Sequence, residues 1–238
     1  MKIALLGYGK MGKEIEKLAI EKGHSIILKV DVDNANTFSM DDLSKADVAI
    51  EFSTPHSVYN NILKCFEANV PIVVGTTSWS DKLEEVKKIC KEKDQAIFYS
   101  SNYSIGVNIF FEINKRLAQL MNKQNNYDVT IEEIHHTQKL DAPSGTAITL
   151  ANDVLKEVKS KTKWVNEIQN KKDELLITSL RIENIPGTHT IKYGSDVDSI
   201  EIKHTAHNRK GFAGGALMAA EWLAGKKGIF GMQDLLKL

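Results

Sequence analysis

The first hundred residues of the chain alternate between short apolar runs and longer stretches of helical periodicity. Continuous apolar runs of this kind are typical of parallel strands that are buried on both faces. The predicted strands are residues 3–6, 25–32, 47–52, 71–75 and 96–99, with helices after the first, third and fourth. This alternation predicts an α/β fold, in which a doubly wound, Rossmann-type parallel sheet carries helices on both faces.

The pattern changes beyond residue 100. A long helical stretch at 105–122 is followed by a strand at 129–134 and by a second helix at 147–158. Three runs of alternating, β-branched residues come next, separated by glycine-containing turns, and they are expected to be antiparallel. These runs are residues 175–182, 188–193 and 199–205. The second half of the chain is therefore predicted to be a separate, mixed α+β domain.

The last helical stretch, residues 215–224, is expected to pack against the first domain. That domain would then be discontinuous, with residues 1–105 and 208–238 in one domain and residues 106–207 in the other. The stretch 156–173 is rich in lysine, glutamate and asparagine, and it is interpreted as a solvated loop or helix face.

Composition narrows the class of protein. Lysine and arginine together number 31, as do aspartate and glutamate, so the net charge is zero and no overall field attracts nucleic acid or an anionic membrane. The apolar start of the chain ends at Gly7, too early for a signal-peptide core or a membrane span. Cys65 and Cys90 lie in apolar helical segments and are interpreted as buried free thiols, as in a reducing compartment. The sequence thus predicts a cytoplasmic protein without nucleic-acid or membrane partners.

A glycine-rich loop follows the first predicted strand and opens the first predicted helix. It consists of Gly7, Tyr8, Gly9, Lys10, Met11 and Gly12. The first glycine permits the tight turn, the second lets a pyrophosphate approach the backbone, and the third lets helix and strand pack closely. The first amides of the helix then face the anion. In this context the loop predicts a dinucleotide site, and a purely structural glycine turn is the alternative.

An acidic residue ends the second predicted strand. Asp31 lies about 20 residues beyond Gly12, where such a side chain accepts hydrogen bonds from the ribose of a dinucleotide. The residues that follow Asp31 include no arginine for a 2′-phosphate, so NADH is favoured over NADPH. Lys10 in the glycine loop is a cation that could compensate, which leaves the use of both cofactors open.

Small polar residues follow the fourth and fifth predicted strands. Open α/β sheets bind ligands outside the carboxyl ends of their strands, so these residues could hold the nicotinamide amide and ribose. Loops that merely cap helices would explain either group alone. The candidates are Gly75, Thr76, Thr77, Ser100, Ser101, Asn102 and Tyr103.

The segment 133–147 concentrates charged and polar side chains at the end of a predicted strand. Glu133 and His135 occupy odd-numbered positions and therefore share a strand face. His136 is adjacent, and Lys139 adds a full charge nearby. Because histidine titrates near neutral pH, one imidazole of the pair can bind substrate while the other transfers a proton. Ordinary half-exposed residues at a strand end are the alternative.

The same segment continues into a predicted helix start. Pro143 suits the first turn, so the amides of Ser144, Gly145 and Thr146 would lie at the positive end of the helix and attract a carboxylate. An ordinary helix start is again the alternative. A zinc site is disfavoured, because the cysteines are far away in the chain and the other histidines show no ligand spacing. No metal is therefore predicted.

The core His-His-x-x-Lys-x-Asp-Ala-Pro-Ser-Gly-Thr-Ala of this segment resembles the signature of the 4-hydroxy-tetrahydrodipicolinate reductase family. The resemblance spans the whole chain. Further matching stretches stand in the order that the family has them, at residues 7–12, 75–77, 101–108, 187–190 and 212–216. The chain is thus identified as a member of this family of NAD(P)H-dependent oxidoreductases.

The resemblance implies a dinucleotide-binding domain and a substrate-binding domain that also builds a homotetramer. It implies loss of the ring hydroxyl as water, followed by reduction of the conjugated cyclic imine dicarboxylate to tetrahydrodipicolinate, in the diaminopimelate route to lysine. By position, His135 resembles the proton donor and Lys139 the second catalytic residue. His136, Gly145 and Thr146 resemble the residues that hold the dicarboxylate, over which the domains would close.

Three features depart from the commoner family pattern and concern the cofactor. The glycine loop is one residue shorter, and Val32 and Thr54 stand where arginines are frequent. Two other functions remain to be weighed. Another two-domain nicotinamide oxidoreductase of a small amino acid would lack the Pro-Ser-Gly-Thr loop, and a non-catalytic dinucleotide-binding module would bind NADH without oxidising it.

Overall fold

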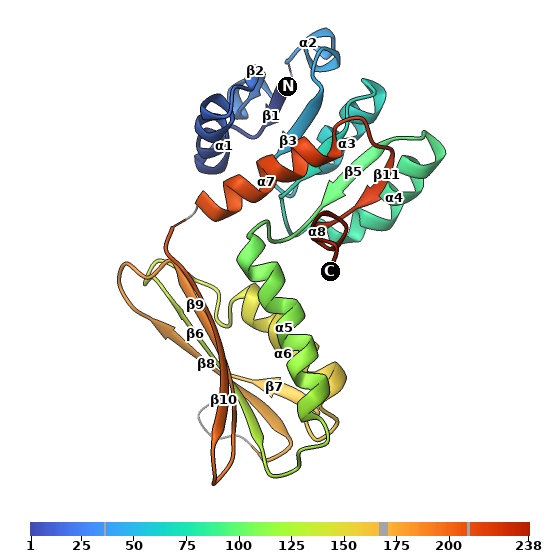
Figure 1. Ribbon diagram of the computed structural model, residues 1–238. Coiled ribbons are helices and arrows are strands. Elements are labelled where there is room, and N and C mark those ends of the chain that lie inside the picture. Colours follow the sequence, from blue (N-terminus) through green and yellow to red (C-terminus); the bar gives the residue numbers. More distant parts are fainter. Residues whose placement is uncertain (36, 167–170, 209) are drawn as a thin grey trace. The chain divides into compact units, whose positions relative to one another are not determined.

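The computed structural model describes residues 1–35, 37–166, 171–208 and 210–238. They form two compact units, one of Met1–Ile105 with Lys210–Leu238 and one of Gly106–Arg209 (Figure 1). The first unit is therefore discontinuous in sequence. Within the described ranges, no helix is both long and apolar enough to cross a membrane.

A parallel sheet forms the centre of the first unit. Among the described residues it has six strands in the order β11-β5-β4-β3-β1-β2, and every neighbouring pair is parallel. The strands are β1 (Lys2–Leu6), β2 (Ser25–Val30), β3 (Val48–Glu51), β4 (Ile72–Val74), β5 (Ala96–Tyr99) and β11 (Gly228–Phe230). The strand order reverses between β1 and β3, which is where doubly wound sheets bind ligands. The fold class predicted from the apolar runs is confirmed.

Helices cover both faces of this sheet. Ile3 and Leu5 of β1 belong to a core cluster that includes residues of α1 and α7, whereas Ala4 and Leu6 belong to a second cluster with residues of α3 and α4. This division follows from the alternation of side chains along a strand. The helices are α1 (Lys10–Glu21), α2 (Met40–Ser44), α3 (Val58–Glu67), α4 (Leu83–Glu92), α7 (Lys210–Leu223) and α8 (Met232–Leu236).

Several predicted elements differ from the structure in the first unit. β2 ends at Val30 rather than at residue 32, because the Asp31 side chain caps a short 3-10 turn, Val32–Asn34, by accepting a hydrogen bond of 2.8 Å from the next amide. The short elements α2, β11 and α8 were not predicted, since three to five residues give little periodic signal. Cys65 and Cys90 are buried free thiols, as predicted.

The second unit contains a mixed sheet. Its described residues form five strands in the order β10-β9-β6-β8-β7. The strands are β6 (Asp128–His135), β7 (Lys163–Val165), β8 (Glu174–Arg181), β9 (Gly187–Gly194) and β10 (Ser199–Ala206). The helices α5 (Ile105–Met121) and α6 (Gly145–Glu157) contribute Phe110 and Leu150 to a core cluster with Val129 of β6 and Ile177 of β8. This is the mixed α+β architecture that the sequence predicts.

Two predictions for the second unit are wrong in detail. The strands from residue 174 onward are not all antiparallel, because β8 runs parallel to both β6 and β7, while β9 pairs antiparallel with β6 and β10. The polar stretch 156–173 is not wholly a loop or helix face, because it contains the edge strand β7. Residues 167–170 of that stretch lie outside the described residues.

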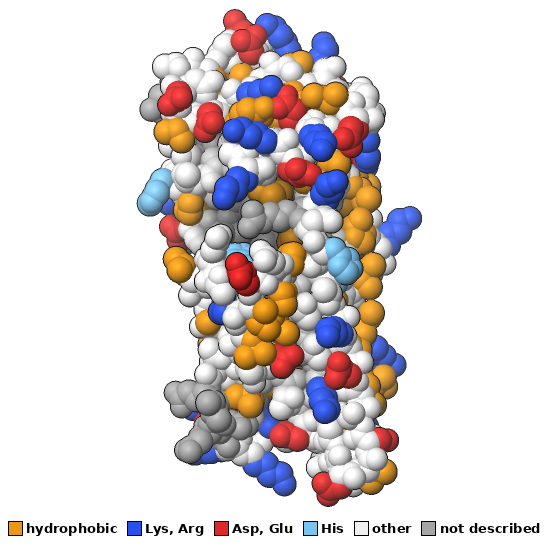
Figure 2. All heavy atoms as spheres, turned by 90° about the vertical axis from the view of Figure 1, so that its left-hand side faces the viewer, with side chains coloured by type: hydrophobic (Ala, Val, Ile, Leu, Met, Phe, Trp, Pro, Cys, Tyr) orange, Lys and Arg blue, Asp and Glu red, His pale blue; other side chains and the backbone are white. Residues whose placement is uncertain are grey.

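The sheet face turned away from the α5 and α6 cluster is partly apolar. Ile134 of β6 is paired with Leu180 of β8, and Leu180 is 38% exposed. Leu176 lies farther along β8 on the same face and is partly exposed. Figure 2 shows hydrophobic side chains gathered in the lower half of the view, over this sheet. A face of this kind in an isolated chain is typical of a surface that packs against another subunit.

Candidate active site

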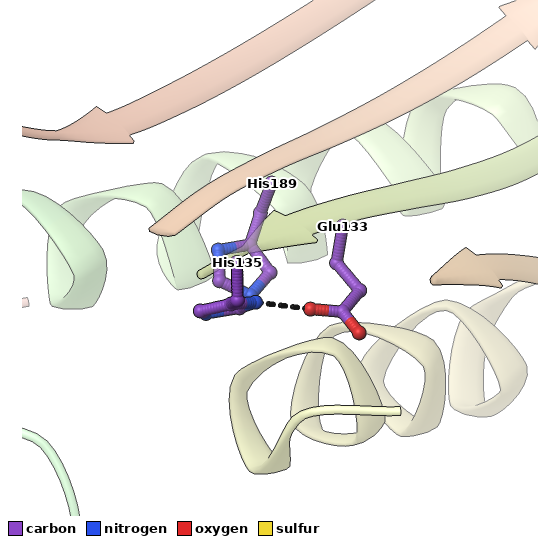
Figure 3. Close-up of side chains that lie close together, drawn as sticks. All are labelled: Glu133, His135 and His189. Carbon is purple, nitrogen blue, oxygen red and sulfur yellow. Dashed lines mark hydrogen bonds and ion pairs between the residues drawn. The ribbon is translucent and has the colours of Figure 1, made fainter. Parts of the chain in front are cut away.

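Three ionisable side chains of the second unit lie together where β6 ends and β9 begins. Glu133 and His135 both come from β6, and His189 comes from β9, where strand pairing places it opposite Glu133. Figure 3 shows the carboxylate of Glu133 facing the imidazole of His135, with the ring of His189 next to that imidazole. The predicted strand face thus brings two of the three together, and the fold adds the third.

Glu133 is a fully buried carboxylate with a partner on each oxygen. Its Oε1 accepts a hydrogen bond of 2.9 Å from Nη1 of Arg181, and its Oε2 accepts one from Nδ1 of His135. Burial raises the pKa of Glu133, but the hydrogen bonds from His135 and Arg181 outweigh it and lower that pKa to about 2. Glu133 is therefore ionised at neutral pH.

This carboxylate determines how His135 can act. An ionised carboxylate only accepts hydrogen bonds, so Nδ1 of His135 carries a hydrogen. The other ring nitrogen, Nε2, lies beside Gly187, where an added Cβ would stand 2.9 Å from it. Nε2 is consequently the atom through which His135 can exchange a proton.

Arg181 also holds the loop that follows β6. Its Nη2 donates to the carbonyl of Asp141 at 2.6 Å, and its Nε donates to the carbonyl of Lys139 at 3.3 Å. Within the loop, Nζ of Lys139 forms an ion pair of 2.8 Å with the carboxylate of Asp141. One guanidinium therefore contacts both the carboxylate that binds His135 and the backbone that carries Lys139.

His189 links His135 to the start of α6. The two imidazole rings meet edge to face with centroids 5.1 Å apart, and Nε2 of His189 lies 3.0 Å from Oγ of Ser144. Burial, followed by the neighbouring His135, lowers the pKa of His189 to about 3, so this ring is neutral at neutral pH. Oγ of Ser144 accepts a hydrogen bond of 3.2 Å from the amide of Ala147 and thereby caps the helix.

α6 begins at Gly145, later in the chain than the prediction, which placed Pro143 in the first turn. Ser144 is the N-cap, so Pro143 precedes the helix instead of occupying its first turn, and the first helical amides are those of Gly145 and Thr146. Both remain available to an anion, because the serine side chain satisfies Ala147. Gly145 is exposed, and a Cβ added there would meet no described atom within 4 Å. His136 directly follows β6, and its buried Nδ1 has no hydrogen-bond partner among the described residues.

The same cluster has the composition of a metal site. One ligand atom from each of Glu133, His135 and His189 lies within 4.8 Å of the others. However, Arg181 and the Nδ1 hydrogen of His135 already occupy the two carboxylate oxygens, and a guanidinium at this position repels a metal cation. The arrangement fits an ion-pair network better than a metal centre.

Sequence reasoning missed part of this cluster. The spacing of the histidines does not single out His189, and no sequence pattern points to Arg181. The available signal was the stretch 187–190, which matches the family, but only the pairing of β6 with β9 shows what His189 contacts.

The neutral state of His189 predicts a pH dependence of stability. Unfolding lets this side chain regain a pKa near 6.5, so the unfolded chain binds a proton that the folded chain does not. Its stabilising contribution is complete above pH 6.5 and is lost as the pH falls toward 3. We expect His189→Gln to lose about 2 kcal/mol less stability than the wild type between pH 7 and pH 5.

Urea unfolding at the two pH values measures this difference. Glu133 does not interfere, because its lowered pKa makes its contribution fall only between about pH 4.5 and 2. Equal pH dependence in the two proteins would show that His189 is not buried in its neutral form.

In the first unit, the glycine loop has the backbone that a dinucleotide requires. Gly7 has φ +104°, and a Cβ there would lie 2.2 Å from the carbonyl oxygen of Phe52. A Cβ on Gly12 would lie 2.4 Å from the carbonyl oxygen of Gly7, whereas one on Gly9 would meet no described atom within 4 Å. Gly9 is the N-cap of α1, and it has no side chain to satisfy the first amides. These residues fit the pyrophosphate of a nicotinamide dinucleotide.

The other residues of this loop are placed differently. Lys10 is exposed at the start of α1, and Met11 is partly buried in the core. Tyr8 donates its hydroxyl hydrogen to Glu16, and Nζ of Lys29 lies 4.9 Å from the centre of its ring. Tyr8 is thus held by side chains of α1 and β2.

Asp31 follows β2 and is exposed. One of its carboxylate oxygens accepts from the next amide at 2.8 Å, and its own amide donates to Oδ1 of Asn34 at 2.7 Å. This turn fixes the backbone of Asp31 at the end of the strand, and a carboxylate has further lone pairs for a ribose.

The strand-end residues divide into exposed and structural groups. Thr77 and Ser101 are exposed, whereas Thr76 is buried and accepts a hydrogen bond of 2.9 Å from the amide of Ser53. Gly75 lies against the ring of Phe52, which a Cβ would approach to 2.2 Å.

The loop after β5 is held by its own hydrogen bonds. Ser100 Oγ donates to the carbonyl of Asn102 at 2.7 Å, and Oδ1 of Asn102 accepts from the amide of Ser104 at 2.9 Å. Tyr103 is buried in the core, and its hydroxyl donates to the carbonyl of Val74 at 2.7 Å. The side chain of Tyr103 therefore has a structural task, and only its backbone is left to contact a cofactor.

Comparison with known proteins identifies the family. Residues 1–103 match the family described as Dihydrodipicolinate reductase, N-terminus, and residues 106–236 match Dihydrodipicolinate reductase, C-terminus. The chain belongs to the dihydrodipicolinate reductase family. It is accordingly an oxidoreductase, and the resemblance drawn from segment 133–147 is confirmed.

Individual relatives cover the full length. A 4-hydroxy-tetrahydrodipicolinate reductase of Christiangramia forsetii is 50% identical over 236 residues, which cover 99% of this chain and 98% of the relative. One of Thermosipho africanus is 35% identical over 239 residues, covering 100% of this chain and 98% of the relative. A dipicolinate-bound dihydrodipicolinate reductase from Paenisporosarcina sp. TG-14 has a TM-score of 0.80 at 22% identity over 98% of each chain, so it shares the fold of this reductase.

Proposed function

We propose that this reductase binds its cyclic dicarboxylate at the amino end of α6, with His135 as proton donor and Lys139 beside the ring. The observation that carries the proposal is the continuous contact between the two parts of the site. His189 meets the ring of His135 at 5.1 Å and the helix cap Ser144 at 3.0 Å. These two contacts connect the assigned proton donor to the helix start that is assigned to the carboxylate.

The substrate carboxylate is assigned to the amides of Gly145 and Thr146. These amides stand at the positive end of a helix of 13 residues, and the absence of a Cβ on Gly145 leaves room for the anion. His136 adds a ring whose Nδ1 has no partner among the described residues. Binding at these groups would fix the ring of the substrate relative to His135.

When bound, NADH or NADPH supplies a hydride to the conjugated imine that remains after the ring hydroxyl leaves as water. The substrate then needs a proton. His135 can deliver it from Nε2 once the ring has taken up a second proton from water and become an imidazolium, while Glu133 keeps its hydrogen bond to Nδ1. Glu133 also balances the positive charge of the imidazolium. The proton and the hydride together account for the two hydrogens gained.

Lys139 is assigned to electrostatic stabilisation beside His135. Its ammonium is paired with Asp141 at 2.8 Å and is partly exposed, so a substrate carboxylate can take over one of its hydrogen bonds. A cation there stabilises negative charge that develops on the substrate.

The first unit is assigned to the dinucleotide, and we expect NADH to be preferred. Asp31→Ala should weaken NADH binding by roughly tenfold or more, because the ribose hydroxyls lose a charged hydrogen-bond acceptor. NADPH binding should weaken less, since the same change removes a negative charge facing the 2′-phosphate. Fluorescence titration of both nucleotides measures the two changes.

Asp33→Ala is the matched control, because Asp33 is an exposed aspartate of the same turn. Its affinities should stay near the wild-type values. Equal loss of NADH and NADPH affinity in Asp31→Ala would contradict the role of Asp31 in cofactor choice.

A homotetramer is proposed for the assembled enzyme. Support comes from the open face of the second-unit sheet, where Ile134 and Leu180 form an apolar pair. Burying such side chains between subunits is favourable. Light scattering of the purified chain measures the mass of the assembly.

A coupled assay tests the proposed function. The preceding synthase generates the substrate from pyruvate and aspartate semialdehyde, and the loss of NADH absorbance follows turnover. The reductase should oxidise NADH only when the synthase is present. A non-catalytic binding module would bind NADH without oxidising it, and a reductase of another small amino acid would not respond to this substrate.

A further inference from the structure

We propose that Glu133, clamped by Arg181, is the positioning residue that sets the orientation and the tautomer of His135. This inference rests on the proposed function, because it concerns how the assigned proton donor is prepared. Glu133 does not need to touch the substrate. Its task is to keep a hydrogen on Nδ1 of His135, so that Nε2 alone faces the reaction.

The burial of Glu133 supports this role. Its side chain has no exposed surface, so an ionised carboxylate there is costly unless donors surround it. Arg181 and His135 supply donors to its two oxygens. Because Arg181 has only donors, it fixes the carboxylate as an acceptor for both neighbours.

Gly187 leaves the space that the ring of His135 occupies. The residue lies at the start of β9, and an added Cβ would stand only 2.9 Å from Nε2 of His135. Glycine therefore leaves room for the ring in the orientation that Glu133 imposes. The carbonyl of His135 also accepts a hydrogen bond of 2.8 Å from the amide of Ile182, which fixes the backbone next to the ring.

Arg181 extends the same control to Lys139. The guanidinium donates to the carbonyls of Lys139 and Asp141 while its Nη1 holds Glu133. Arg181 thus fixes the loop that carries Lys139 directly, and it fixes the ring of His135 through Glu133. Neither contact requires Arg181 to reach the substrate.

The variant Glu133→Gln separates positioning from simple packing. The introduced amide has nearly the same shape, but only one of its two ends accepts a hydrogen bond. Arg181 needs that acceptor, so the amide nitrogen would face Nδ1 of His135 and donate to it. In the neutral ring the hydrogen would then move from Nδ1 to Nε2, which reverses the tautomer. The imidazolium that donates from Nε2 would also lose the carboxylate that balances its charge.

Two measurements follow this change. Nitrogen-15 NMR of histidine-labelled protein, with His135 assigned through His135→Asn, should show a hydrogen-bearing Nδ1 in the wild type and a bare Nδ1 in Glu133→Gln. In the coupled assay, kcat should fall by about 10- to 100-fold, the range found for carboxylates that orient a metal-bound imidazole through its other nitrogen. KM should change little, because the carboxylate seat is untouched.

Glu132→Gln is the matched control, since Glu132 is the exposed neighbour on the opposite face of β6. It should leave the spectrum and kcat unchanged. The wild-type spectrum needs no variant to fold, and a bare Nδ1 in it would overturn the proposal. Unchanged kcat in a folded Glu133→Gln protein would overturn it as well.

These outcomes are distinct from failure of the proposed function. If the wild-type chain does not oxidise NADH with the synthase product, the function is wrong, whatever the spectrum shows. If the wild type turns over but His135→Asn does so equally well, His135 is not the proton donor and the positioning proposal falls with it. Turnover that depends on His135 but not on Glu133 contradicts only the positioning role.

Discussion

His135→Ala should lower kcat by about 100- to 10,000-fold, the range that a positioned general acid contributes. The reason is that the variant removes the only imidazole of the cluster whose Nε2 is directed by a carboxylate on Nδ1. His189 cannot replace it, because burial lowers its pKa to about 3 and keeps it a neutral imidazole instead of the imidazolium that a proton donor requires. KM should change only a few-fold, since the amides of α6 remain. The coupled assay at saturating substrate measures both constants.

Two further variants, one of them a control, test the same catalytic assignment. His207→Ala removes an exposed histidine of the same unit and should keep the wild-type kcat. Lys139→Ala should lower kcat and also raise KM, because the ammonium is assigned to charge that develops on a bound dicarboxylate. If His135→Ala and Lys139→Ala both turn over normally, the catalytic assignment is wrong.

The second large effect is expected from removing one helix amide. Gly145→Pro eliminates the amide hydrogen at the first position of α6, where proline is otherwise well tolerated. Ser144 already has the extended backbone that precedes a proline, with φ −65° and ψ 152°. The helix should therefore form as before. The loss of a hydrogen bond to a charged carboxylate should raise KM by roughly ten- to 100-fold.

Gly145→Ala is the matched control, because it adds a side chain but keeps the amide. The space around Gly145 accepts a Cβ, so the alanine variant should bind substrate better than the proline variant. Thermal unfolding of both variants checks that α6 is intact. Equal KM values in the two variants would mean that this amide does not hold the substrate.

The sequence predicts the first unit well because its signal is local. Each buried strand is a continuous apolar run, and the alternation with helices leaves few topologies for a parallel sheet. The end of β2 was misplaced because the capping hydrogen bond of Asp31 depends on side-chain geometry, not on hydropathy. Elements as short as β7 and β11 derive their stability from pairing with neighbouring strands.

The sequence predicts only part of the candidate site, because the other part depends on strand pairing between distant segments. Alternation along β6 shows that Glu133 and His135 face the same side. It cannot show that Arg181 and His189 meet them, because β8 and β9 are distant in sequence and their pairing directions are not encoded in a period. The parallel direction of β8 was missed on the same grounds. Those pairings bring Arg181 into contact with Glu133 and His189 into contact with His135.

The most direct test of the account is a crystal structure of the chain with dipicolinate bound. We expect one carboxylate of the ligand to lie about 2.7–3.2 Å from the amide nitrogens of Gly145 and Thr146. Nε2 of His135 should face the ring of the ligand, with Nδ1 still bound to Glu133. A dicarboxylate bound away from the start of α6, or an Nε2 turned away from it, would contradict the account.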